Sequence, residues 1–284
     1  MKNEPTTVRS QLGSIAREAS ELPGLRMLAR PIRRSLFRRP YRDDNDYYGV
    51  YTSYTDALAA AQALSAGSLP ATYDTDEAGR MYRAHLRSIR VSDYPLVYWL
   101  SRLFAEGQRR VFDLGGHIGV SYYGFQPYLD HPPDLTWTIN DVPSVMAAGR
   151  AWATEHDPSR RLSFVESPDA AEGSDILVST GALQYLDYTL PQLLGRMSSK
   201  PRHVLVNLTP MHPTLEFFTL QNLGIAICPY RIMSAPRFAD AMESCGYRVL
   251  DHWQSYERHL RIPFNPAHTV DSYHGYHFKL ADEG

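Results

Sequence analysis

The sequence has little cysteine and no long hydrophobic run. Cys228 and Cys245 are the only cysteines among 284 residues. Two thiols are too few for a disulfide framework or a cysteine-based metal site, so we expect them to be free in a reducing compartment. No apolar segment has the length that a membrane-spanning helix needs. The first residues lack the charged, then apolar, then small pattern of a signal peptide, which predicts a cytoplasmic protein.

Histidine is more plentiful, but its spacing does not indicate a metal site. Five of the eleven histidines fall late in the chain, namely His252, His259, His268, His274 and His277. Their spacing matches no zinc pattern, and no cysteine or regularly spaced acidic residue accompanies them. We therefore expect no bound metal.

The net charge of −2 is unevenly distributed. Residues 1–42 carry ten Lys and Arg against three Asp and Glu, which leaves a balance of −9 for the rest of the chain. A body with this excess of acid is a poor general binder of nucleic acid. The stretch Arg26–Arg42 mixes arginines with apolar residues, a pattern suited to the inner, anionic face of a membrane or to an acidic partner. A tail docked on its own acidic body is the alternative.

Changes of pattern divide the chain into three parts. Residues 1–42 form a basic extension with helical periodicity. Residues 43–107 form a prelude predicted to be helical, because Tyr54–Ser65 is rich in Ala and Leu and Leu96–Phe104 repeats its apolar residues at helical spacing. Residues 108–284 alternate short apolar runs with helical stretches, which is typical of an α/β sheet.

Seven short apolar runs in the third part predict strands. Asp175–Thr180 and His203–Leu208 are apolar almost throughout, as in parallel strands buried on both faces. Tyr247–Trp253 and Tyr276–Leu280 have no helix between them, so we expect them to pair as an antiparallel ribbon. The other three runs are Val111–Leu114, Thr136–Ile139 and Leu162–Val165. The predicted fold is α/β, with a seven-stranded, mostly parallel sheet and an antiparallel strand at one edge.

The segment 210–236 does not fit this minimal pattern. Two β-type runs, Glu216–Gln221 and Ile225–Ile232, flank Asn222-Leu223-Gly224, which predicts a hairpin. The hairpin follows the carboxyl end of a strand, at the rim where ligands bind in open α/β sheets, so a substrate lid is one interpretation. An extension of the sheet, or a contact between two copies in a homodimer, is the other.

A glycine-rich turn follows the first of these strands. Residues 110–119 read RVFDLGGHIG, and a helix is expected to begin near Val120. Glycines allow the backbone to approach a ligand that a Cβ would obstruct, and the first N–H groups of a helix favour a carboxylate. Asp113 is suited to hold an ammonium group, directly or through water.

An acidic residue follows the second strand. Asp141, in TINDVP, lies 22 residues beyond Gly119 and is placed to accept both ribose hydroxyls of an adenosine. A structural alternative stays open, in which Asp113 forms the turn and Asp141 caps the next helix. The dinucleotide motif G-x-G-x-x-G requires glycines where His117 and Val120 stand, which disfavours an NAD-dependent oxidoreductase.

These segments resemble a known superfamily. DLGGHIG is similar to motif I of class I S-adenosylmethionine (SAM)-dependent methyltransferases, D-x-G-x-G-x-G, and NDVP to the acidic D-L-P that contacts ribose in small-molecule O-methyltransferases. DLGGHIGVSYYGF, SDYPLVYWL, STGALQYLDY and TLQNLGIAICPYRI also resemble a bacterial methyltransferase group, with some members in surface-polysaccharide gene clusters. The resemblance covers roughly residues 48–280. It implies a Rossmann-like fold, SAM as cofactor, and O-methylation of a small molecule or a glycan intermediate.

The motifs and the resemblance together assign a cofactor site. The expected cofactor-binding residues are Asp113, Gly115, Gly116, His117, Gly119, Asp141, Val142, Thr180, Gly181 and Gln184. His117 departs from the family pattern because it stands at the central glycine of motif I, where a Cβ narrows the pocket or forces a different backbone. A catalytically inactive protein that binds SAM or serves as a scaffold therefore stays open as an alternative.

Methyl transfer from SAM requires no fixed catalytic signature. The leaving group is excellent, so alignment of nucleophile, methyl and sulfur supplies most of the catalysis, and a general base helps a hydroxyl acceptor. The candidate catalytic residues are His212, Tyr185 and His117, because imidazoles titrate near neutral pH and the loop after the fourth strand borders the methyl group. The expected acceptor-binding residues are Tyr123, Gln221, Asn222, Tyr230 and Arg231. Arg231 or Arg261 suits an anionic acceptor.

Overall fold

A seven-stranded, mostly parallel sheet forms the centre of the computed structural model, which describes the chain except residues 1–25, 41–45, 66–68, 82 and 282–284. The strand order is β4-β3-β2-β5-β6-β10-β9, and β10 is antiparallel to both of its neighbours. The strands are β2 (Arg110–Leu114), β3 (Thr136–Asn140), β4 (Leu162–Phe164), β5 (Ile176–Thr180), β6 (His203–His212), β9 (Tyr247–Ser255) and β10 (Tyr273–Leu280). This sheet confirms the predicted strands and the predicted α/β class.

The position of the antiparallel strand refines that prediction. β10 lies between β6 and β9, so the edge strand β9 runs in the same direction as β6. β5 and β6 are buried along nearly their whole length. Their apolar sequences follow from this burial, because helices cover both faces of the sheet.

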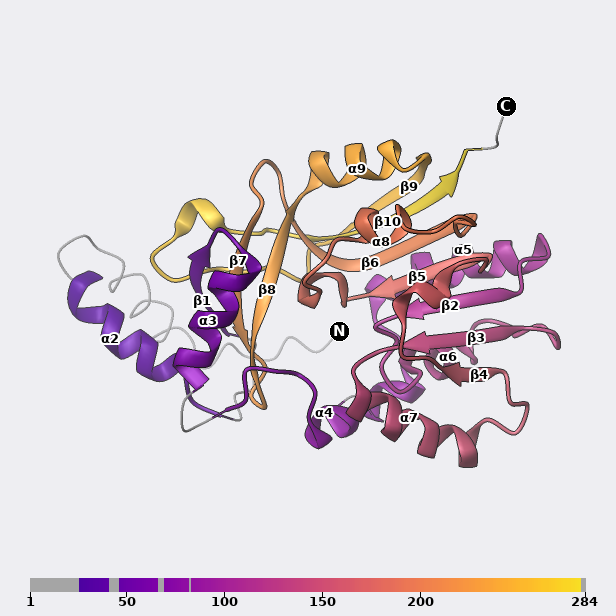
Figure 1. The fold of residues 1–284 in the computed structure, drawn as a ribbon, viewed down its shortest axis with the longest axis horizontal. Coiled ribbons are helices and arrows are strands. Elements are labelled where there is room, and N and C mark those ends of the chain that lie inside the picture. Colours follow the sequence, from indigo (N-terminus) through magenta and orange to yellow (C-terminus); the bar gives the residue numbers. More distant parts are fainter. Residues whose placement is uncertain (1–25, 41–45, 66–68, 82, 282–284) are drawn as a thin grey trace, which may run out of the picture.

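Helices form a layer on each face of the central sheet (Figure 1). α5 (Tyr94–Ala105), α6 (Val120–Phe125) and α7 (Pro143–His156) pack on one face. α8 (Leu190–Leu194) and α9 (Ala235–Ser244) pack on the other. The remaining short helices are α4 (Asp76–Met81), η1 (Arg83–Arg87), η2 (Val91–Asp93), η3 (Pro168–Ala171), η4 (Leu183–Tyr185) and η5 (Pro266–His268).

Three further strands extend the sheet to ten strands within the described ranges. β7 (Phe217–Asn222) and β8 (Ile227–Ser234) form the predicted hairpin. β8 pairs in parallel with the carboxyl end of β6. β1 (Asp46–Tyr51) pairs with the free edge of β7. The prediction of a wholly helical prelude was therefore wrong at β1, whose sequence DYYGVY is rich in residues that favour strands.

The hairpin is covered on both faces. On one face, α3 (Tyr54–Ser65) packs against it through Ala57 and Ala61. On the other, the segment 256–272 packs against it through Leu260 and Val270. Every residue of β7 and β8 is buried, so the hairpin forms a fixed wall of the molecule.

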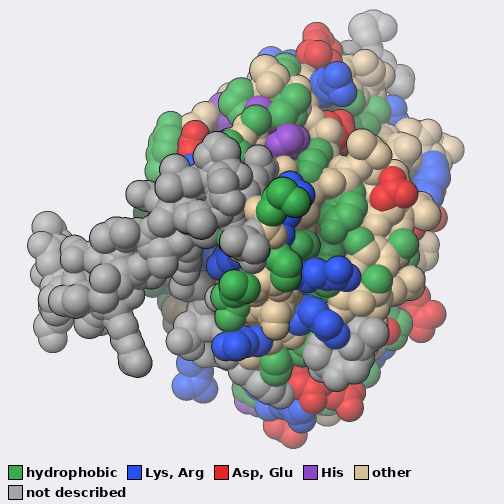
Figure 2. Space-filling view, turned by 90° about the vertical axis from the view of Figure 1, so that its left-hand side faces the viewer, with side chains coloured by type: hydrophobic (Ala, Val, Ile, Leu, Met, Phe, Trp, Pro, Cys, Tyr) green, Lys and Arg blue, Asp and Glu red, His purple; other side chains and the backbone are tan. Residues whose placement is uncertain are grey.

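The described part of the basic extension contains α2 (Arg26–Phe37). Two apolar side chains of this helix face solvent, Met27 with 82% of its surface exposed and Ile32 with 63%. Figure 2 shows this side of the molecule, where Lys and Arg side chains lie among hydrophobic ones. No helix in the described ranges is long and apolar enough to span a membrane. Contact with a membrane surface, with an acidic partner or with a second copy stays a prediction.

Candidate functional site

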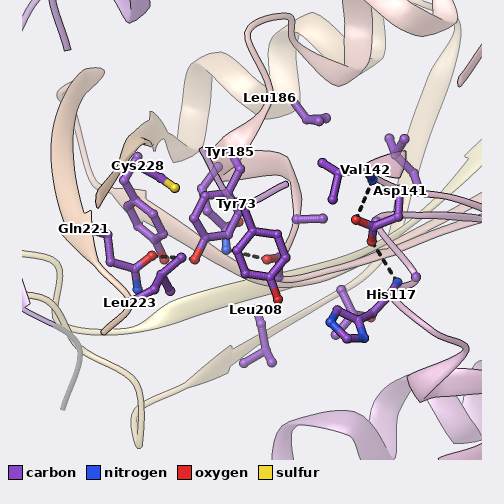
Figure 3. Close-up of a pocket in the computed structure, with 18 of the residues that line it drawn as sticks. Tyr73, His117, Asp141, Val142, Tyr185, Leu186, Leu208, Gln221, Leu223 and Cys228 are labelled. Carbon is purple, nitrogen blue, oxygen red and sulfur yellow. Dashed lines mark hydrogen bonds between the residues drawn. The ribbon is translucent and has the colours of Figure 1, made fainter. Parts of the chain in front are cut away.

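A cavity of about 530 Å³ lies at the carboxyl ends of β2, β3 and β5 and reaches the β7–β8 hairpin. In Figure 3, His117 and Asp141 lie at one end, Gln221 and Cys228 at the other, and Tyr185 between them. Open α/β sheets bind ligands at this edge, and the volume is within the usual range for cofactor and substrate sites.

The turn after β2 forms the motif end of the cavity, which comprises residues 113–117 and Asp141. Gly115 has a φ of +74°, and a Cβ there would lie 2.1 Å from the Cβ of Ala182. A Cβ at Gly116 would lie 2.5 Å from the Cγ of Asp113. Protein atoms therefore exclude a side chain at both positions, whereas the sequence had indicated a close approach by a ligand.

The free energy of unfolding of the Gly115→Ala variant is expected to be about 3 kcal/mol lower than that of the wild type. The added methyl group would overlap the Ala182 side chain, and this clash adds to the strain of a positive φ. Gly173→Ala is the matched control. Gly173 has a φ of +73° and nothing within 4 Å of its Cβ position, so this variant should lose only about 1 kcal/mol. Urea unfolding measures both values. Equal losses would mean that the turn shifts freely away from Ala182.

Asp141 holds the same turn from the end of β3. Its Oδ2 accepts a hydrogen bond from the His117 N–H at 2.8 Å, and its Oδ1 accepts one from the Val142 N–H at 2.7 Å (Figure 3). Burial raises the pKa of Asp141 to about 6. The structural role left open by the sequence is therefore present. Each carboxylate oxygen still has a second lone pair, and Asp141 lines the cavity, so it can also accept hydroxyl groups from a ligand.

Asp113 is completely buried beneath the turn. Its Oδ2 accepts a hydrogen bond from Trp137 Nε1 at 3.1 Å, whereas Oδ1 has no hydrogen-bond partner in the described part of the chain. Burial raises the pKa of Asp113 to about 7. A buried acceptor without a partner costs stability, and a cationic group of a ligand would satisfy it.

His117 replaces the missing motif glycine through its backbone. Its φ of +56° lies in the left-handed region that a glycine adopts easily. The imidazole is directed to the Ala78 carbonyl oxygen, 2.9 Å from Nε2, and only 7% of the residue is exposed. Burial lowers the pKa of His117 to about 4. The side chain is therefore neutral at pH 7, and it is poorly suited to the role of general base.

The end of β5 and the loop after it add polar atoms to the cavity wall. Thr180 Oγ1 and Gln184 Oε1 are buried without a hydrogen-bond partner among the described residues, and both side chains line the cavity. Gln184 Nε2 donates to the Gly181 carbonyl at 2.8 Å, which fixes the loop. Together with Asp113 Oδ1, the wall presents three unsatisfied acceptor atoms.

Tyrosines form the hairpin end of the cavity, which comprises Tyr47, Gln221, Tyr230 and Tyr273. The Tyr273 hydroxyl lies 3.1 Å from that of Tyr47 and 2.9 Å from that of Tyr230. Gln221 Nε2 donates to the Tyr47 hydroxyl at 3.3 Å, and Gln221 Oε1 accepts from Tyr185. Burial raises the pKa of Tyr47 and of Tyr230 well above the ordinary value. These hydroxyls therefore stay protonated and act as donors rather than bases.

Four predicted ligand residues do not line the cavity. Gly119 precedes α6 with a φ of +98°, and Tyr123 packs in the hydrophobic core. Asn222 donates to carbonyl groups at and just beyond the end of α2. Arg231 donates to two carbonyl groups in the loop 187–188. Asn222 and Arg231 thus tie the hairpin to its neighbours, which their sequence position alone did not reveal.

His212 also lies outside the cavity lining, so its assignment as a general base was wrong. Its Nδ1 accepts hydrogen bonds from the N–H groups of Thr214 and Leu215, at 3.1 and 2.9 Å. Its Nε2 lies 3.2 Å from the Ala267 carbonyl oxygen. Both ring nitrogens are occupied by neighbouring backbone, which leaves neither to take a proton from a substrate.

Tertiary structure adds lining residues that the sequence had not singled out. They come from segments far apart in the chain: Tyr47, Tyr73, Arg90, Arg258 and Tyr273. No local motif connects these positions. The signal that was available was the aromatic and basic composition of the prelude and of the link between the last two strands.

Comparison with known proteins finds no matching family model and no matching curated protein. Similar solved structures include the 1,6-didemethyltoxoflavin-N1-methyltransferase of Burkholderia thailandensis, with 14% identity and a TM-score of 0.47 over 86% of this chain and 100% of that one. Magnesium protoporphyrin IX methyltransferase of Synechocystis PCC 6803 has 11% identity and a TM-score of 0.47, over 74% and 96%. An O-methyltransferase family protein of Burkholderia thailandensis has 18% identity and a TM-score of 0.45; the match covers 74% of this chain and 59% of that protein. At such scores the functional conclusion has to come from the site itself.

Proposed function

We propose that this protein is a SAM-dependent methyltransferase that acts on a small molecule. One observation carries the proposal. A single cavity at the carboxyl edge of the sheet joins the glycine turn after β2, the carboxylate after β3 and the acceptor atoms after β5. SAM presents a ribose diol and an ammonium group, which donate hydrogen bonds and require acceptors, and a sulfonium whose positive charge is favoured near oxygen atoms.

The motif end fits these groups. Asp113 Oδ1, Thr180 Oγ1 and Gln184 Oε1 are buried acceptors that no described protein group satisfies. An ammonium group would donate to such atoms, and a carboxylate partner would make the hydrogen bond strong. Asp141 keeps lone pairs for the ribose hydroxyls while it holds the turn.

The same turn is a poor site for a pyrophosphate. The N–H groups of Gly115, His117 and Val120 already donate to protein oxygens. A dinucleotide needs several free backbone N–H groups at this point, so an NAD-dependent enzyme is disfavoured. For the same reason, the carboxylate of SAM has fewer backbone donors here than the glycine-rich sequence had led us to expect.

Bound SAM would supply an electrophilic methyl group. The residues of this chain would hold the cofactor at the motif end and the acceptor at the hairpin end, with Tyr185 between the two. The described lining carboxylates, Asp113, Asp141 and Glu166, lie at or just beyond the carboxyl ends of β2, β3 and β4, so the hairpin end offers no ready base. Catalysis would therefore rest on proximity and alignment. Oxygen as the methylated atom and a glycan intermediate as the acceptor stay predictions.

Calorimetric titration of the full chain with S-adenosylhomocysteine (SAH) tests the proposal. We expect one site with a dissociation constant in the micromolar range and much weaker binding of NAD. Absence of both binding heat and a thermal shift at millimolar SAH would contradict the proposal. Tight SAH binding without methyl transfer from SAM to any product of the enzymes encoded by neighbouring genes would favour the alternative of an inactive scaffold protein.

A further inference from the structure

We infer that the hairpin end of the cavity, together with Arg90 and Arg258, is an acceptor subsite that takes an anionic oxygen, as in a carboxylate or phosphate group. This inference rests on the proposed function, because it names the acceptor class of the same cavity. Two observations support it: positive and negative side chains lie at different ends of the cavity, and the tyrosine hydroxyls have more donors than short hydrogen bonds among themselves.

Charged side chains are segregated along the cavity. The described lining carboxylates lie at or just beyond the carboxyl ends of β2, β3 and β4, whereas Arg90 and Arg258 come from the segments before η2 and after β9. Arg258 interacts electrostatically with the hydroxyls of Tyr47 and Tyr273. Asp93 and Glu257 lie near these arginines, but neither lines the cavity. A ligand at the hairpin end would therefore meet positive charge, and one at the motif end negative charge.

The tyrosine cluster has one more hydroxyl donor than its short hydrogen bonds use, and this donor is the surplus. Tyr47, Tyr230 and Tyr273 carry three hydroxyl protons, and among the described residues their hydroxyls make two O···O contacts at hydrogen-bond distance, both with Tyr273. Tyr230 also interacts with the Tyr47 hydroxyl, but over a longer distance than these two contacts. Gln221 Nε2 donates into this group, and the proton of Tyr185 goes to Gln221 Oε1, so neither uses the surplus. Whichever way these two hydrogen bonds run, one hydroxyl proton is left without a short internal hydrogen bond and is available to a stronger outside acceptor. All three tyrosines line the cavity.

These two features select the same chemistry. An anionic oxygen would accept the surplus proton and would pair with the arginines, and charge-assisted hydrogen bonds are the strong ones. A cationic group would meet arginines without a lining carboxylate to offset them, and it would leave the surplus donor unsatisfied. The enclosing wall restricts the occupant to a small molecule, since the volume has to hold the cofactor as well.

Fluorine NMR on the full chain, with and without saturating SAH, tests the inference. The probes are 4-fluorobenzoate, 4-fluorophenyl phosphate and the neutral 4-fluorobenzamide. At least one anion should bind about fivefold or more tightly than the amide, and the better anion identifies the source as carboxylate or phosphate. Arg258→Ala should remove this preference for the anion over the amide, because an exposed ion pair strengthens binding by about fivefold.

Arg261→Ala is the matched control. Arg261 lies in the same segment, but it pairs with Asp271 at 3.7 Å and does not line the cavity, so anion binding should be unchanged. Equal affinity for anion and amide, no binding by any probe, or a preference that survives Arg258→Ala overturns the inference. Failure of SAH to bind overturns the proposed function instead, and the titration without SAH still decides the anion site.

Discussion

The Asp141→Ala variant should bind SAH about a hundredfold more weakly than the wild type. Two hydrogen bonds from ribose hydroxyls to this carboxylate would be lost, each worth about 1.5 kcal/mol at this partly exposed charged acceptor. The variant also releases the N–H groups of His117 and Val142, which hold the turn in place. Calorimetry with SAH measures the loss directly.

Asp175→Ala provides the control for a purely structural effect. Asp175 also accepts two backbone N–H bonds, from Arg109 and Arg110 at 2.8 Å each, but it lies at the amino end of β5, away from the cavity. This variant should lose stability, by about 2 kcal/mol, and keep its affinity for SAH. If Asp141→Ala binds SAH as tightly as the wild type, Asp141 does not bind the ribose and only holds the turn.

The Asp113→Asn variant is expected to have opposite effects on stability and on binding. At pH 8 the ligand-free variant should be about 2 kcal/mol more stable than the wild type, because a neutral amide replaces a buried charge. Its affinity for SAH should fall about thirtyfold, because the ammonium group loses a charge-assisted hydrogen bond worth about 2 kcal/mol. Denaturant unfolding and calorimetry measure the two effects.

The pH dependence of the free energy of unfolding tests whether the charge of Asp113 causes the difference in stability. Burial raises the pKa of Asp113 to about 7, so the folded protein keeps this proton between pH 4 and 7 while the unfolded chain has lost it. The resulting stability is present at low pH and is lost as the pH rises through 7. From pH 5 to pH 8 the difference in free energy of unfolding should therefore move by about 3 kcal/mol in favour of Asp113→Asn.

Comparison with the variant cancels the other titrating groups, which both proteins share. His117 is one of these, because burial lowers its pKa to about 4. A difference that stays constant from pH 5 to pH 8 would mean that Asp113 is ionised throughout this range. In the wild type, SAH should also bind more tightly as the pH rises toward 7, since its ammonium group favours the ionised carboxylate.

Local patterns predicted several elements correctly. The helix at Leu96–Phe104 was expected from its apolar spacing, and the structure has α5 there, with Leu96, Leu100 and Leu103 buried. The hairpin around residues 222–224 was expected from two β-type runs about a turn. In both cases neighbours in the sequence are also neighbours in space, so the pattern contains the information.

The errors occur where one residue has several potential partners. His212 lies at the end of a cavity-forming strand, but its ring nitrogens are occupied by the turn that follows. Arg231 lies in the hairpin, but it donates to carbonyl groups of another loop. A residue type and a position on a strand do not determine which polar groups lie within hydrogen-bond distance.

The sequence by itself determined the strands of the central sheet, the glycine turn and the two motif carboxylates, because burial patterns, positive-φ positions and strand ends are local properties. Only the tertiary structure decided that Tyr47, Tyr273 and Arg258 share one cavity with Asp113, since they come from distant segments before and within residues 108–284. It also decided that no described residue gives Asp113 Oδ1 a hydrogen-bond partner. Hydrogen bonds and electrostatic interactions depend on distances between atoms, and chain folding sets those distances for residues more than two hundred positions apart.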